Sequence, residues 1–236
     1  MSGASSGIGE AVAEEFLRRD HHVVGLSRRG SPALAENPAY LDLRADLRDG
    51  KAVREALRRI DGEVARGLRA VILNAGTSPP EQPLTEVPWS TAAEVYASNV
   101  GTALHLVQAA VPVLRENGGG ALVFVGSSTA NGFEPGRWPY AASKAAMTSL
   151  MRACSVEFAA DGITSNEVRP GPVATQMITD GQGDGVDERF LPLLNAGYGT
   201  QWLKSARTAA GWIAALAELP SNGPTGQVFN YSRKVT

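Results

Sequence analysis

The alternation of short β-rich runs with longer helical patterns most constrains the fold of this chain. Strand-like apolar runs lie at 22–27, 39–43, 68–74, 121–126, 163–168 and 226–231. Helical patterns fall between most of them, at about 48–60, 89–116, 139–160 and 205–219. Apolar strands joined by helices are typical of a parallel sheet that is buried on both faces and wound in right-handed crossovers. The sequence therefore predicts a doubly wound α/β fold of the Rossmann type, with helices on both faces of the sheet.

Length, charge and cysteine content narrow the class of protein. A chain of 236 residues is long enough for one large α/β domain over residues 1–236, and its net charge is only -2. The charges are interspersed, which predicts no nucleic-acid surface and no membrane contact. We expect no apolar run near the ~20 residues that cross a bilayer, no signal peptide and a cytoplasmic location. The single cysteine, Cys154, and the three histidines lack metal-ligand spacing, so we predict an inert thiol and no metal.

Glycines at the start of the chain predict a phosphate-binding turn. Gly3, Gly7 and Gly9 follow a G-x3-G-x-G spacing, and apolar residues recur after them at intervals of three and four. This pattern places the glycines at a helix N-terminus, where free N–H groups and the helix dipole attract a phosphate. Ordinary turns use the same residues, and a binding turn of this kind should follow a strand.

The stretch WPYAASKAAM at 138–147 predicts a second functional feature. Pro139 suits the first turn of a helix, and Tyr140 and Lys144 then share one helical face. A phenol titrates near ~10, so it is a poor acid at neutral pH unless a fixed positive charge favours its ionised form. Taken alone, the pair favours an exposed tyrosine and lysine that happen to share a helical face. Ser127 follows the apolar run at 121–126, at a strand end where this fold places its ligand.

These features together resemble the short-chain dehydrogenase/reductase family. The resemblance rests on Ser127, Tyr140, Lys144, the opening glycines, NAG at 74–76 and Asn99 in NVG at 99–101, and it extends from residue 2 to about 231. It implies that Tyr140 is the general acid or base, that Ser127 polarises the substrate oxygen and that Lys144 holds the ribose of the nicotinamide. It also implies that Asn99 positions a water in a proton relay. Ser128 competes with Ser127, which we prefer because it keeps a spacing of thirteen residues to Tyr140.

The resemblance also implies a set of cofactor-binding residues. Asp46 and Leu47 would contact the adenine, although Asp46 could instead be a helix N-cap. The turn after the strand at 163–168 would lie under the nicotinamide, or be simply a turn. The implied set is Gly3, Ser5, Gly7, Ile8, Gly9, Asp46, Leu47, Asn74, Ala75, Gly76, Tyr140, Lys144, Pro170, Gly171, Val173 and Thr175.

The end of the run at 22–27 bears on the choice of cofactor. A carboxylate there would bond the ribose 2′-hydroxyl of NAD, but this chain has Ser27, Arg28 and Arg29. Guanidinium groups pair with phosphate through two charge-assisted hydrogen bonds, which favours NADP(H) over NAD(H). The alternative is that both arginines are ordinary solvated surface residues.

The resulting hypothesis is an oxidoreductase that transfers a hydride between NADP(H) and a small ketone or secondary alcohol. The resemblance also implies a homo-oligomer, a dimer or a tetramer, paired through the helices at about 89–116 and 139–160. Two alternatives lack redox turnover: a dinucleotide-binding sensor and an enzyme of the halohydrin-dehalogenase type. The second normally lacks the glycine turn and carries arginine in place of Lys144. Phe133, Trp138, Met177, Phe190 and Trp202, with a possible lid at 179–188, are candidates for the substrate pocket.

The pattern departs from the family at the first strand, which is absent before the glycine turn. Ser2 stands where the family usually has threonine, and Met1 where the strand would end. We consider three explanations. The chain as given starts inside the strand, another segment such as the tail at 232–236 replaces it, or the gap stays open and impairs the cofactor site. An open gap would leave unpaired backbone groups on both neighbouring strands.

Overall fold

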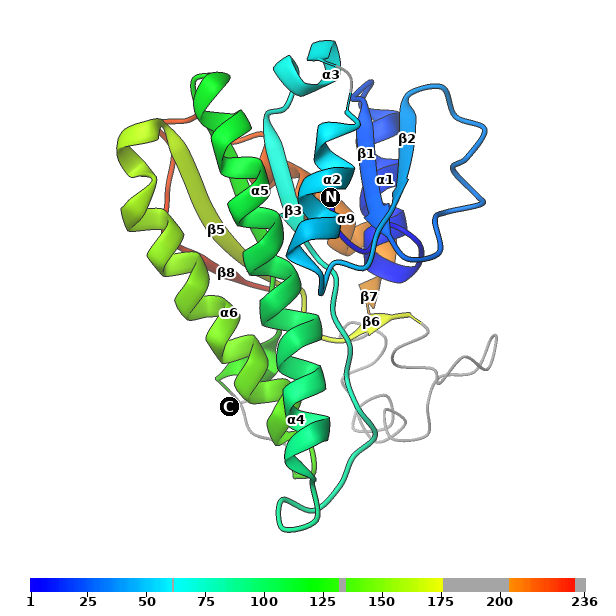
Figure 1. Cartoon of the computed structure of the whole chain (residues 1–236). Coiled ribbons are helices and arrows are strands. Elements are labelled where there is room, and N and C mark those ends of the chain that lie inside the picture. The colour runs from blue at the N-terminus through cyan, green and yellow to red at the C-terminus, as the bar shows by residue number, and fades with distance from the viewer. Residues whose placement is uncertain (61, 132–134, 176–203, 232–236) are drawn as a thin grey trace.

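The computed structural model describes residues 1–60, 62–131, 135–175 and 204–231 and contains the predicted parallel sheet (Figure 1). Its strands run in the order β2-β1 and β3-β4-β5-β8, and every pair between them is parallel. The strands are β1 (Val23–Ser27), β2 (Tyr40–Arg44), β3 (Ala70–Leu73), β4 (Gly120–Val125), β5 (Ile163–Arg169) and β8 (Val228–Asn230). Each matches a predicted run to within a few residues.

Helices cover both faces of the sheet, as Figure 1 shows. On one face α1 (Gly7–Arg18) packs against α9 (Ala206–Ala217). The other face carries α2 (Gly50–Arg58), α5 (Thr102–Glu116) and α6 (Trp138–Glu157). Side chains of β4 alternate between the two cores: Leu122 and Phe124 pack with α5 and α6, whereas Val123 and Val125 pack with α1 and α9. This alternation explains why the strand is apolar throughout, and the predicted doubly wound α/β fold is confirmed.

The first residues of the chain lie between β1 and β3, where a central strand would end. Leu26 N donates to Met1 O at 2.8 Å, and Gly3 N donates to Leu26 O at 2.9 Å. On the other side, Ser2 N donates to Ile72 O at 2.9 Å. Beyond Met1, β1 and β3 border a cavity of about 1110 Å³, and no residue within the described ranges fills it. The tail at 232–236 is outside those ranges, so all three explanations of the gap stay open.

The helical stretch expected at about 89–116 is confirmed, and it contains a π-helical turn that was not predicted. It consists of α4 (Trp89–Tyr96), the π-helical turn (Ala97–Gly101) with Asn99, and α5. By length and composition the whole span could cross a membrane, contrary to our expectation from the apolar runs. However, α5 buries Leu106, Ala110 and Leu114 in the core against the sheet. It is therefore built as a core helix of the domain.

Within the described residues, one short α-helix and two short strands were not predicted. They are α3 (Gly62–Arg66), β6 (Val173–Ala174) and β7 (Lys204–Ser205), of which the last two pair in parallel. Periodicity gives no signal in segments of two to five residues.

Candidate active site

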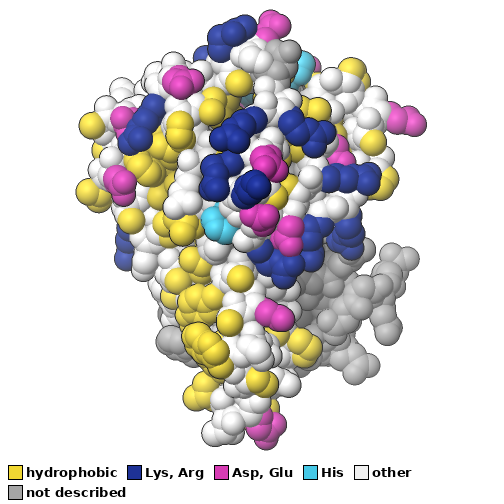
Figure 2. All heavy atoms as spheres, in the orientation of Figure 1, with side chains coloured by type: hydrophobic (Ala, Val, Ile, Leu, Met, Phe, Trp, Pro, Cys, Tyr) yellow, Lys and Arg dark blue, Asp and Glu magenta, His cyan; other side chains and the backbone are white. Residues whose placement is uncertain are grey.

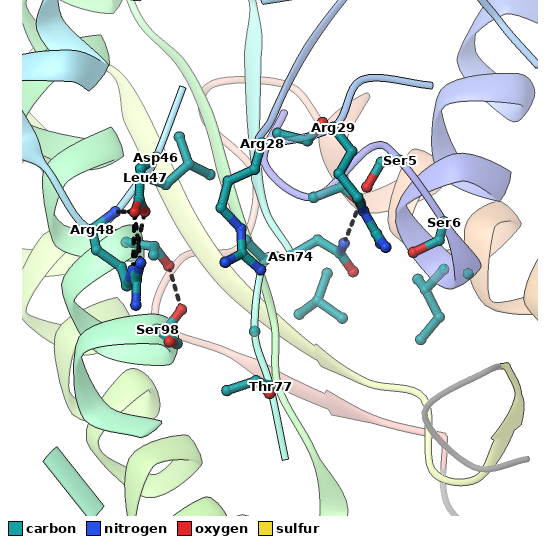
Figure 3. Close-up of a pocket in the computed structure, with 18 of the residues that line it drawn as sticks. Ser5, Ser6, Arg28, Arg29, Asp46, Leu47, Arg48, Asn74, Thr77 and Ser98 are labelled. Atoms are coloured by element: carbon teal, nitrogen blue, oxygen red, sulfur yellow. Dashed lines mark hydrogen bonds and ion pairs between the residues drawn. The ribbon is translucent and has the colours of Figure 1, made fainter. Parts of the chain in front are cut away.

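A cavity of about 290 Å³ opens at the carboxyl ends of β1, β3 and β4, and Figure 3 shows many of the residues that line it. In a doubly wound sheet this is the edge where ligands bind. The structure brings most of the predicted cofactor residues together here. Those that line the cavity are Gly3, Ser5, Gly7, Ile8, Ser27, Arg28, Arg29, Asp46, Leu47, Asn74, Ala75, Gly76, Tyr140, Lys144 and Thr175.

The glycine turn leads directly into α1 and is shaped for an anion. Gly3 and Gly7 have φ angles of 70° and 60°, which side chains rarely adopt. A Cβ on Gly3 would come within 2.9 Å of Asn74 Nδ2. The N-cap residue of α1, Ser6, makes no side-chain cap within the described structure. The first N–H groups of the helix therefore face the cavity without a side-chain acceptor, so the turn fits a pyrophosphate group.

Ser2 performs a structural role in this turn that the sequence did not reveal. Its Oγ accepts hydrogen bonds from Asn74 N and Ala75 N, both at 3.0 Å. Asn74 Nδ2 in return donates to Gly3 O at 3.2 Å. These bonds join the N-A-G segment to the glycine turn, so serine replaces the usual threonine as an acceptor.

One end of the cavity is basic. Arg28, Arg29 and Arg48 line it, and Arg48 pairs with Asp46 through Nη2 and Oδ2 at 2.7 Å (Figure 3). Hydrogen bonds from Arg48 lower the pKa of Asp46 to about 2. The N-cap of α2 is Asp49, which accepts from Lys51 N at 2.8 Å, so the N-cap alternative for Asp46 was wrong. We missed Arg48, although its position directly after Asp46 and Leu47 would have identified it.

The other end of the cavity holds the tyrosine and lysine. Pro139 lies in the first turn of α6, as predicted, and Tyr140 and Lys144 are both buried. Lys144 Nζ donates to Val125 O at 2.9 Å and lies 5.8 Å from the centre of the Tyr140 ring. Arg137 Cζ lies 5.6 Å from that same ring centre, a second cation that the sequence analysis did not identify. Two cationic side chains thus lie near the Tyr140 ring, and Arg137 is also paired with Glu81 at 3.9 Å.

Asn99 lies beside this end, in the π-helical turn, with its side-chain amide already bonded. Its Oδ1 accepts from Thr77 N at 2.7 Å, and its Nδ2 donates to Thr77 O at 3.0 Å and Ser143 Oγ at 2.8 Å. A Cβ on Gly76 would lie 3.0 Å from Asn99 Oδ1 and 3.7 Å from Lys144 Nζ. Asn99 therefore joins the end of β3 to α6 close to the lysine, and its proposed relay role stays a prediction.

Ser127 stands two residues past the end of β4, next to cavity residues Val125 and Gly126. Its Oγ accepts from Thr129 Oγ1 at 2.9 Å and caps the short 3-10 helix Ser128–Ala130. Ser128 belongs to that helix, so the two candidate serines have different local roles. The assignment of Ser127 to the substrate oxygen stays a prediction.

Some predicted residues support the cavity without lining it. Gly9 packs against Gly3 and Asn74, and Pro170 and Val173 are buried on either side of Gly171, which has a φ of 72°. Together with Asn99, Ser127 and the pocket candidate Trp138, these are the predicted and described site residues that do not line the cavity. Met177, Phe190, Trp202, Phe133 and the possible lid at 179–188 lie outside the described residues. Cavity residues that we did not predict are Ser6, Ala45, Arg48, Thr77, Ser98, Thr102, Val125 and Gly126.

Known proteins share this sequence and this fold. The family model "short chain dehydrogenase" matches residues 1–184. The 2,3-dihydro-2,3-dihydroxybenzoate dehydrogenase of Escherichia coli K12 is 31% identical over 75% of this chain and 69% of its own. An uncharacterized short-chain type dehydrogenase/reductase of Sinorhizobium fredii is 30% identical over 98% of this chain and 93% of its own. The chain belongs to the short-chain dehydrogenase family, a family of oxidoreductases.

Solved structures agree with this assignment. ElxO with NADP bound is 25% identical, with a TM-score of 0.79 over 97% of this chain and 94% of its own. The 3-ketoacyl-(acyl-carrier-protein) reductase of Brucella melitensis, solved with NADH, has a TM-score of 0.81 over 98% of this chain and 94% of its own, at 23% identity. The second likeness concerns the fold alone, and the two structures carry different nicotinamide cofactors.

Proposed function

We propose that this protein is an NADP(H)-dependent oxidoreductase that interconverts a small ketone and the corresponding secondary alcohol. The observation that carries the proposal is the arrangement of one cavity. Tyr140 and Lys144 lie at one end, the glycine turn lies in the middle, and Arg28, Arg29 and Arg48 lie at the other end. A dinucleotide has matching parts: a reactive ring, a pyrophosphate and an adenosine end.

The side chains of this site divide the work of binding and proton transfer. The nicotinamide group, when bound, gives or takes the hydride. Tyr140 Oη donates a proton to the substrate oxygen during reduction and accepts one during oxidation. Lys144 spends one of its three N–H donors on Val125 O, which leaves two for the ribose hydroxyls. Ser127 Oγ, if turned toward the cavity, polarises the substrate oxygen.

The basic end supports NADP(H) over NAD(H). Arg28 and Arg29 are exposed at the end of β1, where a 2′-phosphate of the adenosine ribose would approach them. Asp46 carries a negative charge nearby, but its pairing with Arg48 leaves this end of the cavity with a net positive charge. The solved structure of ElxO with NADP bound adds support from a relative.

A fluorescence titration and a turnover assay test the proposal. Tryptophan fluorescence should report tighter binding of NADPH than of NADH, and nicotinamide absorbance should fall when a ketone from a broad panel is added. Tyr140→Phe should lower kcat by about 100-fold or more, because it removes only the proton donor. Its Kd for NADPH should stay within about twofold.

Tyr231→Phe provides the matched control for this variant. Tyr231 stacks on Trp212 with ring centroids 4.0 Å apart and lies away from the cavity, so its loss of a hydroxyl should leave kcat unchanged. Full turnover in Tyr140→Phe would refute the assigned role of the phenol. Tight NADPH binding by the wild type with no turnover across the panel would instead favour the sensor.

We also propose a homo-oligomer in the cytoplasm, where the NADP(H) pool would supply the enzyme. Hydrophobic side chains gather over the region of α4 to α6 in Figure 2, and Trp89 and Val156 are 75% and 81% exposed. Apolar surface of this kind favours burial against a second subunit. Light scattering should give a mass of two or four chains, and a mass of one chain would contradict the proposal.

A further inference from the structure

A row of polar side chains lies buried between β5 and α6, where an α/β domain usually packs apolar residues. Ser165, Glu167 and Arg169 alternate along β5, and all three are at most 2% exposed. Ser165 Oγ donates to Met151 O of α6 at 2.9 Å. Arg169 Nη2 donates to Thr148 Oγ1, also on α6, at 2.9 Å. The helix is therefore fixed to the strand by hydrogen bonds at two successive turns.

These contacts lead from a buried carboxylate to the backbone of Lys144. Arg169 Nε donates to Glu167 Oε1 at 2.6 Å, and both side chains are buried. Thr148 accepts from Arg169 and donates to Lys144 O at 3.2 Å. The ion pair thus contacts α6 one turn after the lysine, on the same helical face.

Glu167 also packs directly under the end of β4. A Cβ on Gly126 would overlap Glu167 Oε1 and come within 2.6 Å of its Cδ. Gly126 follows Val125, whose carbonyl accepts from Lys144 Nζ, and it precedes Ser127. The ion pair therefore contacts α6, which carries Lys144, and the end of β4, which carries Val125. The distance between these two elements decides whether Lys144 Nζ can bond Val125 O.

Stability alone does not account for this pair. Removing two charges from water costs about as much as their attraction returns, so a buried pair adds little net stability. Glu167 Oε2 is buried and has no partner within the described structure, which adds to that cost. The hydrogen bonds of the pair are directional, so they fix the position of β5 relative to α6. Apolar contacts would allow the helix to shift along the strand.

We propose that Glu167, Arg169 and Thr148 are positioning residues for Lys144. They fix the position of α6 relative to β4 and β5, so that Lys144 Nζ lies within hydrogen-bond distance of Val125 O and close to Tyr140. The inference rests on the proposed function of the site, because it assigns the cluster a purpose in that reaction.

A matched pair of single variants tests the link through the helix. Thr148→Val keeps the shape of the side chain and removes both hydrogen bonds. Ser149→Ala, at the next position, removes a hydroxyl that bonds Ala145 O on the exposed side of α6. Thr148→Val should lower kcat about tenfold while KM for the ketone and Kd for NADPH stay within about twofold, and Ser149→Ala should change none of them.

A double variant separates positioning from stability. Replacing the pair by apolar residues, Glu167→Leu with Arg169→Met, should leave the urea midpoint unchanged or higher. Its kcat should nevertheless fall about 100-fold, because a shift near 1 Å in a catalytic group costs that much. Full turnover in a folded double variant would overturn the proposal, and so would equal effects of Thr148→Val and Ser149→Ala.

A crystal structure of the double variant gives a measurement that needs no turnover. The distance from Lys144 Nζ to Val125 O, now 2.9 Å, should lengthen beyond hydrogen-bond range. An unchanged distance would overturn the proposal. If the wild type reduced no ketone, the proposed function would fail, while this distance would still report on the positioning.

Discussion

Replacing Gly9 by alanine should distort the glycine turn at residues 3–9, which lines the cavity. Gly9 lies in the first turn of α1, where alanine normally stabilises a helix by up to about 1 kcal/mol. Here the new Cβ would overlap Gly3 O and come within 2.6 Å of Asn74 Nδ2. Because the closest atom belongs to the backbone, no rotamer change relieves the contact. We expect Gly9→Ala to lose about 1–3 kcal/mol of unfolding free energy, out of a total of ~5–15 kcal/mol.

Gly211→Ala is the matched control, because Gly211 lies in α9 and a Cβ there would meet nothing within 4 Å. It should gain up to about 1 kcal/mol from helix propensity. Urea unfolding followed by circular dichroism measures both variants. An NADPH titration of Gly9→Ala should show affinity about tenfold weaker, since the turn moves away from Asn74. The reasoning would be refuted if Gly9→Ala matched the wild type in both measurements.

Three further predictions concern the cofactor, the thiol and the N-terminus. Replacing Arg28 and Arg29 by alanine should weaken NADPH binding about 100-fold or more and leave NADH binding unchanged in the same titration, because each lost bond to a charged group costs ~1.5–3 kcal/mol and two are lost. Burial raises the pKa of Cys154 to about 11, so a disulfide reagent should label it only after urea unfolding, and rapid labelling of the native protein would contradict its burial. The amino group of Met1 donates to Val24 O at 2.6 Å, and burial lowers its pKa from 8.0 to about 5. Between pH 5 and pH 8 the unfolded chain therefore binds more protons than the folded chain. Stability of the chain that begins at Met1 should therefore rise from pH 5 to 8, and acetylation of that amino group should flatten the rise in the urea midpoint.

Much of the fold could be predicted because the pattern is local. The run at 121–126 is apolar on both sides, and the structure buries β4 between two cores. The regular periodicity at 89–116, in contrast, gave no sign of the π-helical turn at Asn99. That turn coincides with bonds to Thr77 and Ser143, which are 22 and 44 residues away in the chain. No local pattern encodes such a contact.

The candidate site divides in the same way. Tyr140, Lys144 and the glycine turn follow from short spacings, since residues four apart on a helix share a face and glycines mark a close approach. The role of Ser2 did not, because its partners Asn74 N and Ala75 N lie 72 and 73 residues away in the chain. Arg48 and Arg137 were missed although their partners, Asp46 and Tyr140, lie only two and three residues away. Arginines are common on surfaces, and their positions in the sequence do not show which of them face a cavity.

By itself the sequence determined the order of strands and helices, the helical face shared by the tyrosine and lysine, and the bend of the opening turn. These depend on periodicity and backbone sterics, which act over a few residues. Only the tertiary structure decided that Ser2 bonds the N-A-G segment, that Lys144 bonds Val125 O, and that a buried ion pair from β5 contacts the helix behind it. Those contacts join segments far apart in the chain, and their geometry exists only once the sheet and helices have packed.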